Sequence, residues 1–492
     1  MPRVVQVSPR YLAAAVVGLA DLLFYVFVFR NTWIDDTYIQ LQYARTLIEH
    51  GTWGFYAGHP ANTATSPLNV LLIAAAGLPL GSVEWAMMLL TALELAALLG
   101  LLLLLSRRLF GGDFFGWFAF VALATNPLLL STIGMESFLY ALVLIASVYL
   151  FLVRRWLVMA AALGLLTLAR PDGVLLLAVL LPLAEAPFRR KATALGVYAA
   201  TIAPWFIFSW IYLGSLVPDT LVIKIEQTAW GAASFADGLS LYLRRFPLET
   251  VISLLLAPLC LFPLWRCGGE VVRAVTVLAA FGGLHYVVYT ALDVPPYHWY
   301  YVNQLVPMVL IGSVAVTHYA ARVRGRMTAR VLPAIVLAPA AGLLLLLGTE
   351  GFSLREALIN TNWATSGQYR EIGLWMRRNL AEEEAVAARG EIGTFAFYSD
   401  RYLVDEFSDM SIADALIDEA DYDELPVVGP LVALNFLWRQ DHTPLPAPAF
   451  EVAYDPEGRG RRCPPDDPAC WLARDGTTEW IGRSRILVRA TG

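Results

Sequence analysis

The chain has 492 residues, of which 58% are hydrophobic and 15% are charged, and its formal net charge at pH 7 is −6. In soluble globular proteins about a quarter of all residues are charged, so this chain lacks the polar surface that a water-soluble protein needs. No basic stripe interleaved with aromatic residues is present, which excludes the usual pattern of a nucleic-acid-binding surface.

Apolar segments long enough to cross a bilayer recur between residue 11 and about residue 349. A spanning helix needs on the order of 20 apolar residues, and about eleven segments approach this length. No small-residue cleavage site follows the first segment, which predicts a retained span. Residues 67–80 are apolar but short and fit a re-entrant or interfacial segment. The predicted spans are 11–29, 82–105, 114–133, 137–153, 156–169, 174–188, 192–213, 251–265, 274–292, 299–317 and 331–348.

Loops placed alternately on the two sides of the membrane carry unequal numbers of basic residues. Before the C-terminal tail, fifteen Lys and Arg residues fall on one side and six on the other. Because basic residues accumulate in cytoplasmic loops, we expect a plasma-membrane protein with a cytoplasmic N-terminus. The tail beyond Glu350 is then extracytoplasmic.

The chain divides into a predicted transmembrane core, residues 1–349, and a predicted extracytoplasmic α/β domain, residues 350–492. Apolar residues at helical spacing predict a helix over 367–380, and short apolar or alternating segments follow it. Cys463 and Cys470 flank the run PPDDPA on the oxidising side and predict a disulfide. We expect this domain to bind an acceptor. Glu391 is a candidate contact there, with a plain turn carboxylate as the alternative.

The first outer loop, residues 31–66, contains the most distinctive polar pattern. Ile39, Tyr43 and Leu47 lie at i, i+4 spacing and predict an amphipathic helix on the membrane surface that stops near Gly51. Two acidic residues, Asp35 and Asp36, stand at its start, close to headgroup depth. A carboxylate there can take the proton of an attacking hydroxyl. Asp36 is the first candidate base and Asp35 the second, although Asp35 can instead cap the helix.

Other candidates come from separate outer loops. Glu136 could supply a further carboxylate or be an interfacial charge. Arg170 lies in Arg-Pro-Asp-Gly, which is typical of a turn, yet a guanidinium also suits a phosphate. The long loop 214–250 carries Lys224 and Arg244, both candidate phosphate ligands.

The stretch from Asp293 to Tyr301 reads DVPPYHWYY. An aromatic belt at the membrane interface is one explanation. The sharper hypothesis is a wall of the donor site, in which Tyr297, His298 and Tyr301 contact the sugar or its phosphate.

Two carboxylates, Asp21 and Glu94, lie inside predicted spans. Intramembrane acids are candidates for ion paths or proton transfer. They support an alternative function as a transporter or lipid flippase.

Several short motifs together resemble the C-type (GT-C) membrane glycosyltransferases. They are W-I-D-D-T-Y-I-x-x-x-Y-A-R at 33–45, T-S-P-L at 65–68, G-M-E-S at 134–137 and A-R-P-D-G at 169–173. The closest likeness is to bacterial arabinofuranosyltransferases and related mannosyltransferase-like proteins of cell-wall assembly. The segments at 369–380, 389–401 and 402–407 extend the resemblance into the tail.

The resemblance implies a GT-C-like helical membrane fold and inverting transfer from a polyprenyl-phosphate sugar. The sugar would be arabinofuranose or mannose-like, and the acceptor an envelope glycan, lipid or protein. Asp36 would be the base, and basic outer-loop residues would hold the phosphate. His59 and Thr65 are further predicted acceptor contacts. Whether Mg²⁺ or Mn²⁺ takes part stays open, with Asp35 and Glu136 as ambiguous ligands.

Overall fold

A computed structural model describes residues 32–226, 233–323, 331–349, 356–388, 391–419, 428–456, 469–472 and 484–491. The predicted first span with Asp21, and Cys463 of the predicted disulfide, lie outside these residues. Glu94 is described and lies buried. It forms no hydrogen bond or ion pair within the described ranges.

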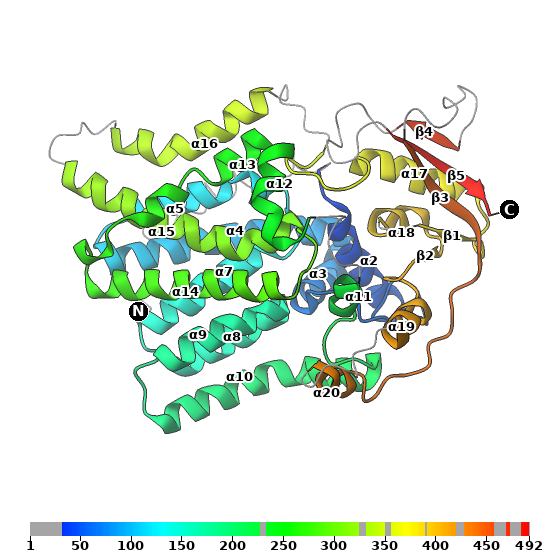
Figure 1. Ribbon diagram of the computed structural model, residues 1–492, viewed down its shortest axis with the longest axis horizontal. Coiled ribbons are helices and arrows are strands. Elements are labelled where there is room, and N and C mark those ends of the chain that lie inside the picture. Colours follow the sequence, from blue (N-terminus) through cyan, green and yellow to red (C-terminus); the bar gives the residue numbers. More distant parts are fainter. Residues whose placement is uncertain are drawn as a thin grey trace, which may run out of the picture.

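The described part of the chain up to Thr349 is a bundle of apolar helices (Figure 1). Five of them are long and apolar enough to cross a membrane, as judged by length and composition. These are Val83–Phe110 (α4), Phe188–Leu213 (α10 and its last turn), Gly269–Ala291 (α14), His298–Arg322 (within η6 and α15) and Leu332–Thr349 (within α16).

Shorter helices fill the rest of the bundle. They are α2 (Asp35–His50), α3 (Pro67–Leu80), α5 (Phe114–Ala124), α6 (Pro127–Leu130), α7 (Ser137–Leu152), α8 (Trp156–Ala169), α9 (Val174–Leu183), α11 (Thr220–Glu226), α12 (Gly238–Arg245) and α13 (Pro247–Ser253). The 3-10 turn η1 (Pro171–Gly173) joins α8 to α9.

Two predicted spans are not continuous helices. The span 114–133 breaks between α5 and α6, where the Asn126 side chain accepts a hydrogen bond from the Leu128 backbone at 3.1 Å. Pro127 starts α6, and its ring leaves no N–H with which to continue the preceding helix. Similarly, the span 251–265 consists of the end of α13 and short 3-10 turns at Ala257–Leu261 and Leu264–Arg266.

Helix α2 forms where the amphipathic pattern predicts it and ends at Gly51, which adopts a left-handed conformation with φ of 66°. The expectation that Asp35 caps this helix is wrong. The N-cap residue is Ile34, and Asp35 already lies in the first turn. The Asp35 carboxylate instead accepts backbone hydrogen bonds from Gly393 at 2.8 Å and Thr394 at 2.7 Å, at the start of α18.

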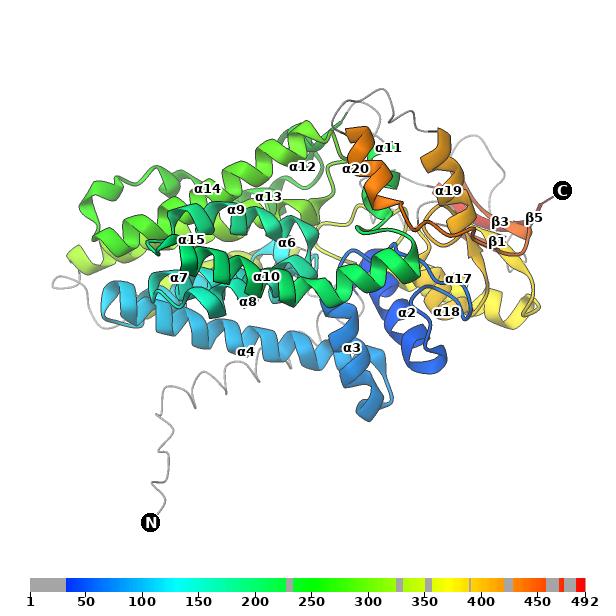
Figure 2. The same ribbon diagram turned by 90° about the horizontal axis from the view of Figure 1, so that it is seen from below.

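The C-terminal region contains a five-stranded sheet in the order β2-β1-β3-β5-β4. Its strands are β1 (Ala385–Ala387), β2 (Leu403–Val404), β3 (Pro448–Pro456), β4 (Cys470–Leu472) and β5 (Ser484–Ala490). β1 pairs in parallel with β2 and β3, whereas β5 pairs antiparallel with β3 and β4. The helices are α17 (Ser366–Asn379), α18 (Gly393–Ser399), α19 (Met410–Glu419) and α20 (Val428–Asn435). Figures 1 and 2 show the sheet at the end of the molecule remote from most of the bundle.

Helices α2 and α18 form the seam between the bundle and the C-terminal region (Figure 1). Gly393 allows their close approach, because a Cβ at this position would lie 2.3 Å from the Asp35 carbonyl oxygen and 2.8 Å from the Ile39 nitrogen. Real Cβ atoms do not come this close to backbone atoms, so only glycine fits here without a shift of one helix.

We expect Gly393→Ala to lower the free energy of unfolding by about 1–3 kcal/mol, since the added methyl group overpacks the seam. Thermal unfolding of the purified protein in detergent measures the effect. Gly367→Ala is the matched control, because its Cβ would meet only Thr365 Oγ1 at 3.8 Å. Equal melting temperatures for the two variants would show that the seam tolerates separation.

Candidate active site

Asp36 lies in the first turn of α2 and is half-buried. Burial raises the pKa of its carboxyl group, whereas the positive charge of Lys224 lowers it. Glu136 raises the same pKa and Arg170 lowers it. Three charged side chains from widely separated segments therefore act electrostatically on the Asp36 carboxyl group.

Glu136 reaches this cluster through a tight turn. Gly134 adopts a φ of 89°, a left-handed conformation that favours glycine. The buried Glu136 carboxylate accepts a hydrogen bond from Arg170 at 3.0 Å and another from the Gln40 amide at 2.6 Å. Gln40 in turn accepts from Asn69 at 2.6 Å. Glu136 is thus fixed by α2, α3 and the end of α8, which rules out a freely solvated interfacial charge.

The Arg-Pro-Asp-Gly motif forms the predicted turn, η1, but its aspartate does more than turn the chain. Asp172 Oδ2 accepts hydrogen bonds from the Arg170 guanidinium at 3.2 and 3.1 Å, from Tyr289 at 2.8 Å and from Asn303 at 3.0 Å. His285 Nε2 lies 3.2 Å from the same oxygen. Asp172 is thus the shared acceptor, or hub, of this cluster, and the sequence analysis did not identify it as a candidate site residue. The signal was a carboxylate set between two apolar helices.

Lys224, on α11, is the second cation of the site. Only 8% of it is exposed, and its Nζ lies 4.3 Å from the ring centre of Tyr297 and 5.6 Å from those of Trp299 and Tyr300. Within the described ranges Lys224 forms no ion pair. Arg170, in contrast, is already paired with two carboxylates. Lys224 is therefore the cation that remains available to an anionic ligand.

Three predicted donor ligands lie elsewhere. His298 is fully buried against the rings of Tyr242 and Trp299. Tyr301 donates its hydroxyl to the Phe235 carbonyl at 2.6 Å and stacks on the Phe235 ring. Arg244 is exposed on α12. In the described ranges no hydrogen bond or ion pair joins these residues to the Asp36 cluster, so their roles stay predictions.

The predicted acceptor contacts are also spread out. Glu391 is buried, and its carboxyl accepts from the Asn362 amide at 2.6 Å. Burial, together with the charges of Asp35 and Asp36, raises the Glu391 pKa well above its ordinary value. His59 is half-buried with its ring 5.9 Å from that of Tyr402. Thr65 lies half-buried just before α3. The charge of Asp36 acts on Glu391, which links Glu391 to the Asp36 cluster.

Asp35, the second candidate base, also has a structural function, because its carboxylate oxygens accept hydrogen bonds from the backbone at the start of α18. Burial raises the Asp35 pKa to about 6, with the two backbone hydrogen bonds opposing this rise. No group of three His, Cys, Asp or Glu side chains that could hold a metal ion occurs among the described residues. Mg²⁺ commonly uses only one or two protein carboxylates together with substrate phosphates, so Asp35 and Glu136 stay predicted metal ligands.

Comparison with known proteins links this fold to a class of solved structures, although no protein-family model and no curated protein sequence matches the chain. ArnT from Cupriavidus metallidurans bound to undecaprenyl phosphate aligns with a TM-score of 0.61 at 14% identity over 98% of each chain. An Archaeoglobus fulgidus oligosaccharyltransferase tethered with an acceptor peptide has a TM-score of 0.57 at 14% identity, over 91% of this chain and 69% of its own.

The Archaeoglobus fulgidus oligosaccharyltransferase AglB in complex with an inhibitory peptide and a dolichol-phosphate aligns with a TM-score of 0.52. The identity is 13%, and the alignment covers 90% of this chain and 69% of that one. These solved proteins are GT-C glycosyltransferases. The chain therefore has the fold of the C-type membrane glycosyltransferases.

Proposed function

We propose that the protein is an inverting glycosyltransferase that takes its sugar from a polyprenyl-phosphate carrier and transfers it to a hydroxyl acceptor. One observation carries the proposal. The charges of two buried cations act on the half-buried Asp36 carboxyl group, and one of them, Lys224, has no ion-pair partner in the described ranges. A base beside a cation without an ion-pair partner suits the displacement of a lipid phosphate. The alignment with a protein bound to undecaprenyl phosphate supports this class of donor.

The proposed reaction assigns a role to each of these residues. The acceptor oxygen attacks the anomeric carbon from the side opposite the phosphate, and the bond from that carbon to the phosphate oxygen breaks. Asp36 takes the hydroxyl proton as the new glycosidic bond forms. The polyprenyl phosphate leaves with the bonding electrons, and its negative charge is stabilised by Lys224.

Arg170 has a different task from Lys224. Its guanidinium already binds Glu136 and Asp172, so it adds positive charge near Asp36 while keeping Glu136 in place. Tyr297, Trp299 and Tyr300 surround the Lys224 ammonium and offer aromatic faces to a sugar ring. These contacts suit a donor whose phosphate meets Lys224 and whose sugar packs beside it.

The finer identity of the substrates is part of the same proposal. We infer an arabinofuranose or mannose-like donor and an envelope glycan, lipid or protein acceptor on the outer face of the plasma membrane. The motif resemblance supports the sugar, and the distribution of basic residues supports the orientation. Protease protection of inside-out vesicles tests the orientation, since an extracytoplasmic tail would resist digestion.

Purified protein in lipid nanodiscs provides the direct test. It is supplied with polyprenyl-phosphate arabinose or polyprenyl-phosphate mannose and with cell-wall glycan fragments, and product formation is followed by mass spectrometry. Transfer with inverted anomeric configuration is the expected result. Absence of transfer from either donor, beside uptake driven by an ion gradient or lipid flipping, would replace the proposal with the transporter or flippase alternative.

We expect Lys224→Met to raise the apparent KM for the donor by about 10–100-fold, because a charge-assisted contact with the phosphate is lost. The acidic limb of the pH–rate profile also moves to higher pH. Lys224 lowers the Asp36 pKa, so without it the base becomes deprotonated only at higher pH. Initial rates at several donor concentrations and pH values measure both effects.

The control for this variant is Arg244→Met, which removes an exposed cation of the same outer loop. Its donor KM and pH profile should match those of the wild type. A larger loss in Arg244→Met than in Lys224→Met would place the phosphate site at α12 instead.

A further inference from the structure

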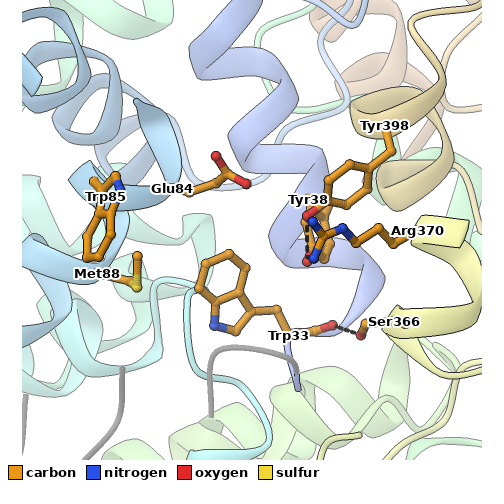
Figure 3. Close-up of a pocket in the computed structure, with 9 residues that line it drawn as sticks. Trp33, Tyr38, Glu84, Trp85, Met88, Ser366, Arg370 and Tyr398 are labelled. Carbon is orange, nitrogen blue, oxygen red and sulfur yellow. Dashed lines mark hydrogen bonds between the residues drawn. The ribbon is translucent and has the colours of Figure 1, made fainter. Parts of the chain in front are cut away.

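A pocket lies on the other side of α2 from Asp36. Tyr38 on this side is two residues after Asp36, and two residues turn a helix by about 200°. The pocket opens between α4, α2 and the C-terminal helices α17 and α18, and encloses about 620 Å³ including its open mouth. Figure 3 shows Glu84, Trp85 and Met88 on one wall and Tyr38, Tyr398 and Arg370 on the other.

The pocket is rich in aromatic rings. The Trp33 ring lies between the two walls (Figure 3), with its centre 5.8 Å from that of Tyr38. The Tyr38 and Tyr398 rings are 5.5 Å apart, and their hydroxyls lie 3.4 Å from each other. Trp85 is 53% exposed although its indole is large and apolar. Ring faces are thus presented to the pocket from three different segments.

The pocket also carries two opposite charges. Glu84 and Arg370 lie on opposite walls (Figure 3), and neither forms an ion pair within the described ranges. The Arg370 guanidinium rests 5.3 Å from the centre of the Tyr398 ring, which orients its remaining N–H groups. A carboxylate that only accepts therefore faces a guanidinium that only donates.

This combination fits a saccharide. The C–H faces of a sugar ring pack on aromatic faces, and its hydroxyls both donate to a carboxylate and accept from a guanidinium. The apolar lining alone would suit an acyl chain, but an acyl chain offers no hydrogen-bonding group to Glu84 or Arg370.

We propose that this pocket is a distal saccharide subsite, which holds a unit of a glycan acceptor other than the unit that receives the sugar. The proposal rests on the proposed transferase function. Because Asp36 and Tyr38 face different sides of α2, the bound unit cannot itself react at Asp36. A chain of several sugars that passes the start of α2 reaches both places, and the subsite then selects acceptors by length.

The test compares Arg370→Ala and Trp85→Ala with two controls in full-length protein in nanodiscs. Arg378→Ala removes an exposed arginine of the same helix α17, and Trp265→Ala removes an 83% exposed tryptophan remote from the pocket. Binding of soluble arabinan and mannan oligosaccharides is measured by saturation-transfer NMR and titration. At least one of the two oligosaccharides should bind the wild-type protein. Its affinity should fall about tenfold or more in Arg370→Ala and severalfold in Trp85→Ala, and it should not change in the two controls.

Kinetics separate the subsite from general damage. The KM for an oligosaccharide acceptor should rise in the pocket variants, whereas kcat and the KM for a monosaccharide acceptor should stay at wild-type values. Equal losses with long and short acceptors, or unchanged oligosaccharide affinity, would overturn the subsite. Displacement of the oligosaccharide by a soluble phosphoethanolamine headgroup would also overturn it and assign the pocket to lipid. Pocket-dependent binding in a protein that transfers no sugar would retain the pocket and reject the transferase function.

Discussion

Asp36→Asn is expected to lower the rate of sugar transfer by about 10²–10⁴-fold, the usual contribution of a positioned general base. The amide has nearly the shape of the carboxylate but cannot take the acceptor proton. Asp36 is half-buried in the first turn of α2 and does not cap another helix, so the variant should fold and still bind the donor. Transfer assays in nanodiscs, with donor binding measured in parallel, distinguish lost chemistry from lost substrate.

Asp35→Asn is the matched control, since it makes the same chemical change one residue earlier. The Asp35 carboxylate holds the backbone of Gly393 and Thr394, and an amide can accept from only one of them through its single oxygen. This variant should therefore lose thermal stability while the folded fraction keeps most of its activity. Full activity of Asp36→Asn would mean that Asp35 or Glu136 is the base. An inactive but stable Asp35→Asn variant would then identify Asp35 as the base.

The helical part of the fold was predictable because its signals are local. The apolar periodicity of α2 and the glycine that ends it lie within one segment, and both the helix and its stop at Gly51 are found. The breaks near Asn126 and after Ser253 were missed, because overall hydropathy does not register a proline and a polar cap inside an apolar run. The parallel pairing of β1 with β3 joins segments about sixty residues apart and has no local signal.

The candidate site, too, was predictable only where its signals are local in the sequence. The paired aspartates, Glu136 and Arg170 stand out by composition alone, because charges are scarce in an apolar chain. Which cation is free depends on tertiary pairing. Lys224 and Arg244 looked equivalent in sequence, yet one lies against Tyr297 at 8% exposure and the other on an exposed helix face. Similarly, the sequence contained no sign that Asp35 would serve α18 rather than its own helix.

Asp172→Ala is expected to lower the free energy of unfolding by about 3–5 kcal/mol, the range observed when one partner of a buried ion pair is removed. Asp172 Oδ2 is the common acceptor for Arg170, Tyr289 and Asn303. Its removal leaves these donors and one guanidinium edge buried without partners. Thermal and chemical unfolding in detergent measure the loss. The remaining folded protein should transfer sugar more slowly, because Arg170, which binds Glu136, loses the carboxylate that holds its other edge.

Asp113→Ala separates this effect from the loss of any aspartate–arginine pair. Asp113 accepts from Arg107 at 2.6 Å, but both side chains are partly exposed, at 23% and 34%. Such a pair contributes about 0.2–1 kcal/mol, so Asp113→Ala should unfold close to the wild type. If Asp172→Ala were as mild as Asp113→Ala, water would have to enter the turn and solvate Arg170. In that case Glu136 alone would hold the guanidinium, and the placement of Glu136 beside Asp36 would not depend on the Asp172 hub.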